Sequence, residues 1–383
     1  MHRAIIFILL GVIIALGICA LLPKQDEQLI SAQVLATPVP VAGFARADAP
    51  RQFSFPADFG PHFDYQTEWW YYTGNLETAD GRHFGYQFTI FRRGILPPEQ
   101  SEERASDWAA EQIYMGHLAI SDVEGEQFHA FQRFARGAAG LAGAESDPYH
   151  VWLEDWTITQ IGTNIYTLSA VNEGIGLHLQ LTDEKGPILQ GNNGLSQKSP
   201  ETGNASYYYS QTRLQTEGEI YIDGEAYSVS GLSWKDHEYS TSAMAADQVG
   251  WDWFSIQLDD GYELMLYKIR RTDGSIDPFS SGALIAPDGS AVQLAAQDFV
   301  IESGDTWNSP HSDADYPMGW SISIPSVDLE IELTPYLVDQ ELNLAFIYWE
   351  GAVQVSAIHN GKQIGGVGYV EMTGYALPFN GDF

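Results

Sequence analysis

Apolar and polar residues alternate along many short stretches of the chain between residues 62 and 383. In one of them, single small or polar residues separate Phe84, Tyr86, Phe88 and Ile90. A repeat of two residues is typical of a β-strand that buries one face, and helical periodicity is nearly absent. Further stretches of this kind read IYTLSAV, LHLQLTD, EIYIDG, AYSVSG, YELMLYKIR, WSISIP and LEIELTP.

Dipeptides that end in glycine punctuate these stretches. Glycine adopts the positive φ angles that tight hairpins need, so each pair predicts a turn between two antiparallel strands. Many short strands joined by hairpins predict an all-β fold, either a sandwich or a barrel. The pairs are Asp80-Gly81, Glu124-Gly125, Asp223-Gly224, Asp260-Gly261, Asp273-Gly274, Asp288-Gly289 and Asn360-Gly361.

The length of 383 residues is enough for about two domains. We expect two antiparallel β-barrel or β-sandwich domains, residues 62–240 and residues 241–383. A weak internal similarity between residues 68–74 and 348–351 is consistent with two related units. The long polar segment 191–206 is expected to lie over a barrel mouth or at an interface, since long ordered loops are often functional.

The N-terminus carries a different pattern. Residues 4–22 are uncharged and almost wholly apolar, and Arg3 precedes them. We expect residues 1–30 to be a signal peptide or a membrane anchor, with the acidic body outside the cytoplasm. An uncleaved anchor, a cleaved signal and a lipidated Cys19 all remain open. Residues 31–61 are rich in Ala, Pro and polar residues and are expected to form a linker.

Composition excludes several classes of protein. A hydrophobic content of 44% with 13% aromatic residues excludes a disordered chain. The formal net charge of −33 repels nucleic acid, so we expect no nucleic-acid partner. Cys19 is the single cysteine, which excludes an internal disulfide and a CxxC metal site.

The candidate chemistry lies between residues 231 and 258. Asp236, His237 and Glu238 stand there close in sequence to several aromatic residues. Burying an ionisable group beside aromatic side chains costs free energy unless the group is paired or its pKa shifts. Groups kept in such places often serve as proton donors. The alternative is a buried polar network that only fixes the packing of a β domain. The aromatic residues of this segment are Trp234, Tyr239, Trp251 and Trp253.

Two familiar catalytic motifs are present only in part, because each lacks one required residue. His237-Glu238 opens a zinc-protease motif, but Thr241 stands where the second histidine is required. Residues 231–235 begin like the serine-hydrolase elbow, but Lys235 replaces its closing glycine. No spacing of histidines supports a metal site.

Five groups of segments resemble the AttH/CrtC-like, lipocalin-like family, which includes carotenoid 1,2-hydratases (hydroxyneurosporene synthases) and bacterial proteins described as predicted secreted hydrolases. The resemblance covers residues 62–383 and implies two packed lipocalin-like β domains with a site in or between them. The segments are TEWWYYTGNL (67–76), SPETGNASYYYSQTRL (199–214), GLSWKDHEYSTS (231–242), GWDWFSIQLDDG (250–261), and YWEGAV with GYVEMTGY (348–353 and 368–375).

The resemblance implies acid-catalysed hydration or isomerisation of an apolar, isoprenoid- or polyketide-like molecule. We expect Asp236 to be the acid, because burial keeps a carboxyl group protonated. His237 or Glu238 would orient water or the acid. No organic cofactor or metal is required. The residues expected to line the ligand site and stabilise a carbocation are Trp69, Tyr71, Trp234, Tyr239, Trp251 and Trp253.

Two other functions remain open. A lipocalin-like barrel can hold an apolar ligand by shape alone, without chemistry. A secreted hydrolase is the third reading, although the sequence offers no recognised nucleophile for it. Replacing Asp236 by Asn distinguishes an enzyme from a ligand carrier, because a carrier tolerates this substitution and an acid catalyst does not.

Overall fold

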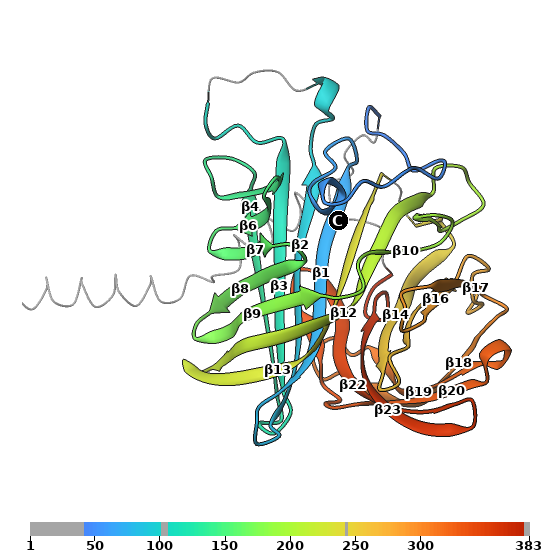
Figure 1. Cartoon of the computed structure of the whole chain (residues 1–383). Helices are drawn as coiled ribbons and strands as arrows, with labels where there is room; N and C mark the ends of the chain where they lie inside the picture. The colour runs from blue at the N-terminus through green and yellow to red at the C-terminus, as the bar shows by residue number, and fades with distance from the viewer. Residues whose placement is uncertain (1–41, 101–105, 242–243, 379–383) are drawn as a thin grey trace, which may run out of the picture. The chain divides into compact units, whose positions relative to one another are not determined.

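The computed structural model describes residues 42–100, 106–241 and 244–378, and in these ranges the fold is all-β, as predicted (Figure 1). Each strand pair in these ranges is antiparallel, and the strands form two sheets. The helical elements of the described residues are three short 3-10 turns: η1 (Ala57–Phe59), η2 (Pro98–Gln100) and η3 (Pro325–Val327).

The first sheet has 13 strands, in the order β4-β3-β2-β1-β13-β12-β9-β8-β7-β6-β5, with β10 and β11 paired to β12. Its end strands approach each other, since β4 contacts β6 and β3 contacts β5, so the sheet curls into a nearly closed barrel. Its strands are β1 (Thr67–Glu77), β2 (His83–Gly94), β3 (Gln112–Asp122), β4 (Gln127–Arg136), β5 (Ala142–Ser146), β6 (Tyr149–Leu153), β7 (Trp156–Gly162), β8 (Ile165–Asn172), β9 (Ile175–Asp183), β10 (Ile188–Leu189), β11 (Leu195–Gln197), β12 (Ala205–Ile222) and β13 (Glu225–Ser240).

The second sheet has 10 strands, in the order β17-β16-β15-β14-β23-β22-β20-β19-β18, with β21 paired to β22. The chain passes from the first sheet to the second between Ser240 and Gln248. The strands are β14 (Gln248–Leu258), β15 (Glu263–Arg271), β16 (Ser281–Ile285), β17 (Ala291–Ala295), β18 (Val300–Asn308), β19 (Asp315–Ile324), β20 (Leu329–Pro335), β21 (Glu341–Asn343), β22 (Ile347–His359) and β23 (Lys362–Met372).

Tight turns at predicted glycine pairs set the register of the longest hairpins. Asp223 and Gly224 have φ angles of 52° and 81° and join β12 to β13. Asn360 and Gly361, with φ angles of 51° and 73°, join β22 to β23 in the same way. Positive φ at both central residues matches the right-handed twist of the flanking strands. These turns therefore fix which residues of each strand face the same side.

Alternation along the strands builds several apolar clusters, and the three largest belong to the two sheets and to the interface between them. On β1, Trp70 and Tyr72 point into the core enclosed by the first sheet, while Tyr71 points to the opposite face. The second sheet has its own core around residues such as Trp320 and Trp349. The third cluster, which includes Tyr71, lies where the two sheets meet.

Buried polar contacts also connect the sheets. The Asn75 amide donates to the Gly368 carbonyl at 3.0 Å, and Ser121 Oγ donates to Gln340 Oε1 at 2.6 Å. Lys185 of the first sheet region forms an ion pair with Glu263 on β15 at 2.6 Å. A side chain on Gly85 would collide with Ala352, where an added Cβ would stand 2.5 Å away. The two sheets are therefore packed closely along β2 and β22.

The prediction of a linker over residues 31–61 is wrong for its described part. Phe44, Ala47 and Phe59 are buried. Arg51 donates to the Tyr239 hydroxyl at 2.5 Å, which attaches this segment to β13. The described residues of this segment are therefore packed against side chains of the first sheet, although their composition is typical of a flexible linker.

The predicted signal or anchor at residues 4–22 lies outside the described residues. Within the described ranges, no helix has the length and apolar character needed to cross a bilayer.

Candidate active site

A cavity of about 170 Å³ lies between the two sheets. A single water needs roughly 10–15 Å³ of such space, so the cavity can hold a molecule of many heavy atoms. Strands β1, β2, β12 and β13 line it from the first sheet, and β14, β15, β22 and β23 line it from the second. Its aromatic lining residues are Trp69, Tyr71, Phe91, Tyr208, Trp251, Trp253, Tyr267, Phe346 and Tyr348.

Strand alternation decides which polar groups reach this cavity. On β13, Asp236, Glu238 and Ser240 line it. The register places Tyr71 of β1 and Ser210 of β12 directly opposite Asp236. Neighbours across a pair of strands point to the same face, so these side chains gather around one carboxyl group.

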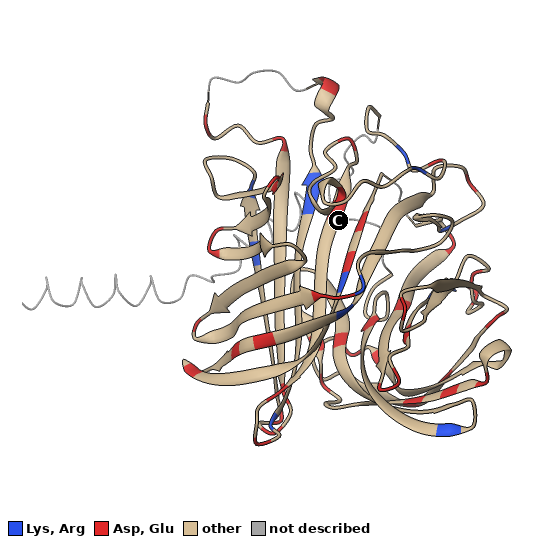
Figure 2. Ribbon diagram, in the orientation of Figure 1, with Lys and Arg blue, Asp and Glu red and all other residues tan. Residues whose placement is uncertain are grey.

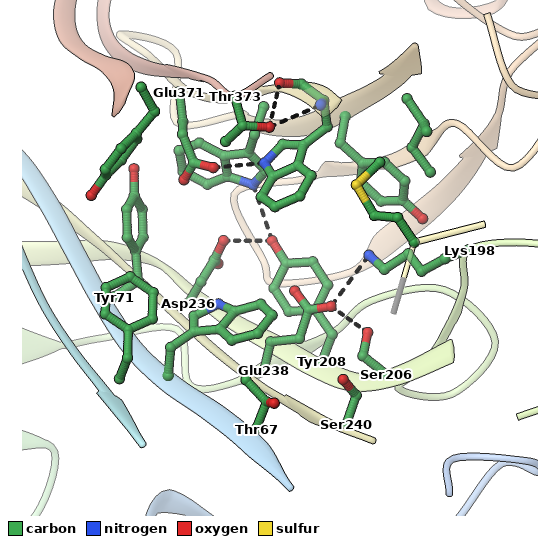
Figure 3. A pocket seen from close by; sticks show the side chains of 18 of the residues that line it. Thr67, Tyr71, Lys198, Ser206, Tyr208, Asp236, Glu238, Ser240, Glu371 and Thr373 are labelled. Atoms are coloured by element: carbon green, nitrogen blue, oxygen red, sulfur yellow. Dashed lines mark hydrogen bonds and ion pairs between the residues drawn. The ribbon is translucent and has the colours of Figure 1, made fainter. Parts of the chain in front are cut away.

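The carboxyl group of Asp236 is held by three hydrogen-bond donors, of which Figure 3 labels Tyr208. The Tyr208 hydroxyl donates to Oδ2 at 2.5 Å. Ser210 Oγ and Trp234 Nε1 donate to Oδ1 at 2.5 and 2.7 Å. Trp253 Nε1 in turn donates to the Tyr208 hydroxyl at 3.1 Å. The orientation of this carboxyl group is therefore fixed from three sides.

Burial raises the pKa of Asp236 to about 7, although its three hydrogen-bond donors act in the opposite direction. The side chain is 4% exposed. An ionised carboxylate loses its hydration in such a place, which favours the protonated form. Asp236 is thus able to exchange a proton near neutral pH.

Glu238 lies on the same face but has a different environment. Ser206 Oγ donates to its Oε1, and Lys198 Nζ forms an ion pair with the same oxygen at 3.3 Å. The Lys198 ammonium also lies 4.2 Å from the centre of the Tyr267 ring. This end of the cavity is therefore polar and charged.

The wall formed by the second sheet carries two more carboxyl groups. Trp251 Nε1 donates to Glu371 Oε1 at 2.6 Å, and burial raises the pKa of Glu371 to about 8. The Tyr71 hydroxyl donates to Glu350 Oε2 at 2.9 Å. Glu350 is fully buried, and burial raises its pKa well above the usual range.

His237 lies on the other face of β13, away from the cavity. Its Nε2 lies 2.8 Å from Glu68 Oε1, and its Nδ1 lies 2.8 Å from the Tyr209 hydroxyl. Burial lowers the pKa of His237 to about 4, so this imidazole is neutral at neutral pH. Lys235 also points to this side, with Nζ 4.8 Å from the ring centre of Phe59.

The nearest arrangement to a metal site in the described residues is also on this side. Ligand atoms of His62, Glu68 and His237 lie within 4.8 Å of one another. However, Arg92 Nε bonds Glu68 Oε2 at 2.9 Å, and the two histidines already bond the same carboxylate. A cationic guanidinium at this distance repels a metal ion, so the cluster fits an internal hydrogen-bond network better than a metal centre.

The AttH-like family model matches residues 46–375 of this sequence. The chain belongs to the AttH-like family. The crystal structure of a protein from Nitrosomonas europaea assigned as AttH is 34% identical, covering 87% of this chain and 100% of that chain with a TM-score of 0.76.

Two further solved structures share the fold of this AttH-like chain. Kievitone hydratase from Nectria haematococca is 14% identical, covering 87% of this chain and 96% of that chain with a TM-score of 0.64. CghA is 11% identical, covering 88% of this chain and 96% of that chain with a TM-score of 0.53. No curated protein matches the sequence.

The AttH-like fold brings together only part of the predicted catalytic group. Asp236 and Glu238 share the cavity, whereas His237 faces the core of the first sheet. The structure does not bring the three residues together in this cavity, because successive residues of a strand point to opposite faces.

The predicted ligand-binding residues divide in the same way. Trp69, Tyr71, Trp251 and Trp253 line the cavity. Trp234 lies behind the lining, where it bonds Asp236. Tyr239 faces the other side of β13, where it stacks on His62 at 3.7 Å between ring centres, and it does not line this cavity.

Sequence reasoning missed Tyr208, Lys198 and Glu371. Lys198 precedes β12 in the long polar segment 191–206, whose position over a site was expected but whose residues were not singled out. Tyr208 is the middle residue of a run of three tyrosines. Only the register of β12 on β13 shows that it is the one that faces Asp236. Glu371 lies on the last strand, and no local pattern connects it to Asp236.

Proposed function

We propose that this AttH-like chain is a hydratase-type enzyme that acts on an apolar isoprenoid- or polyketide-like molecule by acid-catalysed hydration or isomerisation. The observation that carries the proposal is the buried carboxyl group of Asp236 at the wall of an aromatic cavity, with its pKa raised to about 7. Structural carboxylates usually have pKa values below their ordinary range, so this shift favours a functional group.

The chemistry requires a proton donor and a means to stabilise positive charge. Asp236 gives its proton to one carbon of an alkene, and the π electrons form the new C–H bond. The adjacent carbon becomes cationic, and the faces of Tyr71, Trp251 and Trp253 stabilise it through their quadrupoles. Water then attacks the cation in a hydration, or a neighbouring proton leaves in an isomerisation.

Glu238 has the position to orient the attacking water. Its carboxylate is held by Lys198 and Ser206 at the polar end of the same cavity. His237 has no part in the step, because its two ring nitrogens are engaged with Glu68 and Tyr209 on the far side of β13. The fold shared with kievitone hydratase supports a reaction with water.

Carriage of an apolar ligand without chemistry is the alternative. The aromatic lining alone would suffice for it, but a carrier has no use for a carboxyl group that is costly to bury. Hydrolysis has less support, since none of the described residues that line the cavity is a histidine able to activate Ser206 or Ser240.

We also propose that the acidic body works outside the cytoplasm, with residues 4–22 as its signal or membrane anchor. The apolar run and the preceding Arg3 support this topology. Fractionation of cells that express the full chain tests it, and full-length protein in the cytosol would contradict it.

Two variants separate the enzyme from the carrier, assayed on the apolar molecule that co-purifies with the full chain and is identified by mass spectrometry. Asp236→Asn should still bind the molecule but lose turnover by about 10²–10⁴-fold. Trp251→Ala should weaken both binding and turnover, because it removes part of the cavity wall. Asp259→Asn, at an exposed position, is the matched control. If Asp236→Asn turns over the molecule at the wild-type rate, the proposed chemistry is wrong.

A further inference from the structure

Two glutamates are direct neighbours on the second-sheet wall of the cavity. Glu350 on β22 and Glu371 on β23 are cross-strand partners in the antiparallel register. Such partners point to the same face with Cβ atoms about 4.5–5.5 Å apart, and like charges in this arrangement repel each other. The fold therefore places two carboxyl groups where they cannot both be ionised cheaply.

Their surroundings do not offset this repulsion with a cation. The hydrogen-bond donors to the pair are neutral: the Tyr71 hydroxyl for Glu350 and the Trp251 indole for Glu371. Glu350 Oε1 is buried and has no hydrogen-bond partner among the described residues. Among the ion pairs of these residues, neither glutamate takes part. A buried carboxylate oxygen without a partner is costly, so Glu350 keeps its proton.

Glu371 differs from Glu350 because it lines the cavity itself (Figure 3). It comes from the second sheet, whereas Asp236 comes from the first, so a ligand in the cavity can contact both carboxyl groups. The charge of Asp236 contributes to the raised pKa of Glu371. When Asp236 holds its proton this contribution disappears, and Glu371 releases its own proton more readily.

We propose that Glu371 is a second catalytic carboxyl group, which accepts a proton from the attacking water while Asp236 protonates the alkene from the other wall. This inference rests on the proposed function and deepens it, since it assigns the second proton transfer of a hydration. Glu350, the cross-strand neighbour of Glu371, stays protonated and takes no part in the transfer.

The proton balance of the step is complete. The Asp236 O–H bond breaks as the alkene π electrons form a C–H bond. A lone pair of water forms the C–O bond at the cation, and the proton that leaves this oxygen binds to Glu371. Asp236 is then ionised and Glu371 protonated, and proton exchange with water restores the starting state. No oxidant, reductant or further reactant is needed.

Isotope incorporation distinguishes the two proton transfers, using squalene and geranylgeraniol as probes with the full chain. In D₂O, Glu371→Gln should still exchange deuterium into the alkene, because Asp236 still forms the cation. In H₂¹⁸O, the same variant should lose ¹⁸O incorporation by about 10²–10⁴-fold. Asp236→Asn should lose both isotopes, and Glu332→Gln, exposed on the same sheet, should lose neither.

The outcomes separate this inference from the proposed function. A wild-type chain that incorporates neither isotope overturns both. A wild-type chain that incorporates both, together with a Glu371→Gln variant that retains ¹⁸O incorporation, overturns only the role of Glu371. The pH profile of ¹⁸O incorporation is a further readout, because Glu371→Gln should remove the limb near pH 8 that Glu371 sets in the wild type.

A second measurement needs no substrate. Infrared difference spectra at about pH 6 should show one protonated carboxyl band fewer in Glu371→Gln and one fewer in Glu350→Gln, since both pKa values lie higher. On raising the pH through about 8, the Glu371 band should disappear first. If Glu371→Gln removes no protonated band, Glu371 does not exchange a proton in this range and the inference is wrong.

Discussion

At the scale of single residues, the site is built from carboxyl groups placed where water is scarce. Asp236 illustrates the cost: burial raises its pKa to about 7 even though Tyr208, Ser210 and Trp234 all donate to it. A protein under selection for stability alone has little reason to keep such a group. The proton that Asp236 retains is what makes addition to an alkene feasible.

Asp236→Asn should therefore change how stability depends on pH. The folded chain keeps this proton up to about pH 7, whereas the unfolded chain loses it near 3.8. Between these values the folded state binds more protons, so the wild type loses stability as pH rises. Urea unfolding at about pH 5 and at about pH 8 measures this change. The free energy of unfolding of the variant, relative to that of wild type, should be higher at about pH 8 than at about pH 5. A constant difference between the two chains would contradict the buried, titrating carboxyl.

Tyr208→Phe tests one of the hydrogen bonds that oppose protonation of Asp236. Removing the hydroxyl takes away a donor that favours the carboxylate, so the pKa of Asp236 should rise further. The limb of the pH–rate profile that reports Asp236 should move to higher pH. An unchanged limb would show that another group sets it.

Sequence patterns predict such residues unevenly. Asp236 stands out because an ionisable residue is adjacent to aromatic ones in the chain. Glu371 and Lys198 approach it only through the packing of strands that are far apart in sequence. The position of Glu371 in the cavity depends on the register of β14 on β23, and that of Lys198 depends on the path of the chain before β12. No local sequence pattern specifies either of these.

At the scale of elements, the strand β13 divides the chemistry of its residues between two environments. Asp236 and Glu238 face the cavity, while Lys235 and His237 face the core of the first sheet. The predicted catalytic group placed three consecutive residues in one site, which the alternation of side chains along a strand does not allow. Hairpin turns at glycine pairs were predictable from sequence, but the face that each residue occupies required the register.

His237→Phe tests this division. An aromatic ring is kept, but Glu68 and Tyr209 each lose a buried hydrogen-bond partner. We expect a loss of about 1–3 kcal/mol in the free energy of unfolding. Turnover per folded molecule should stay at the wild-type level, in contrast to Asp236→Asn. A loss of turnover with unchanged stability would return His237 to the catalytic group.

At the scale of the whole molecule, the cavity exists because two curled sheets share one interface. Each sheet has its own core, but polar side chains such as Asn75 and Gln257 bond backbone groups of the other sheet. Acidic residues are spread over both sheets (Figure 2), which agrees with the net charge of −33. The two-sheet, all-β architecture follows from the alternation and turns, whereas the position of the cavity follows from how the sheets pack.

The shared interface predicts cooperative unfolding of the two sheets. Separating them would leave Asn75, Ser121 and Glu263 without their partners across the interface. Scanning calorimetry of the full chain should therefore show one transition for the described body rather than two. Gly85→Leu, which places a side chain against Ala352, should lower the temperature of that transition. Two well-separated transitions would indicate independent domains.

The proposed reaction depends on the transfer of a proton from Asp236 to carbon. The most direct test is the deuterium content of the co-purified apolar molecule after incubation with the full chain in D₂O, read by mass spectrometry. Wild type and Asp259→Asn should introduce carbon-bound deuterium, and Asp236→Asn should bind the molecule but introduce about 10²–10⁴-fold less. Equal deuterium contents for wild type and Asp236→Asn, or none for either, would contradict this transfer and leave a ligand-binding protein.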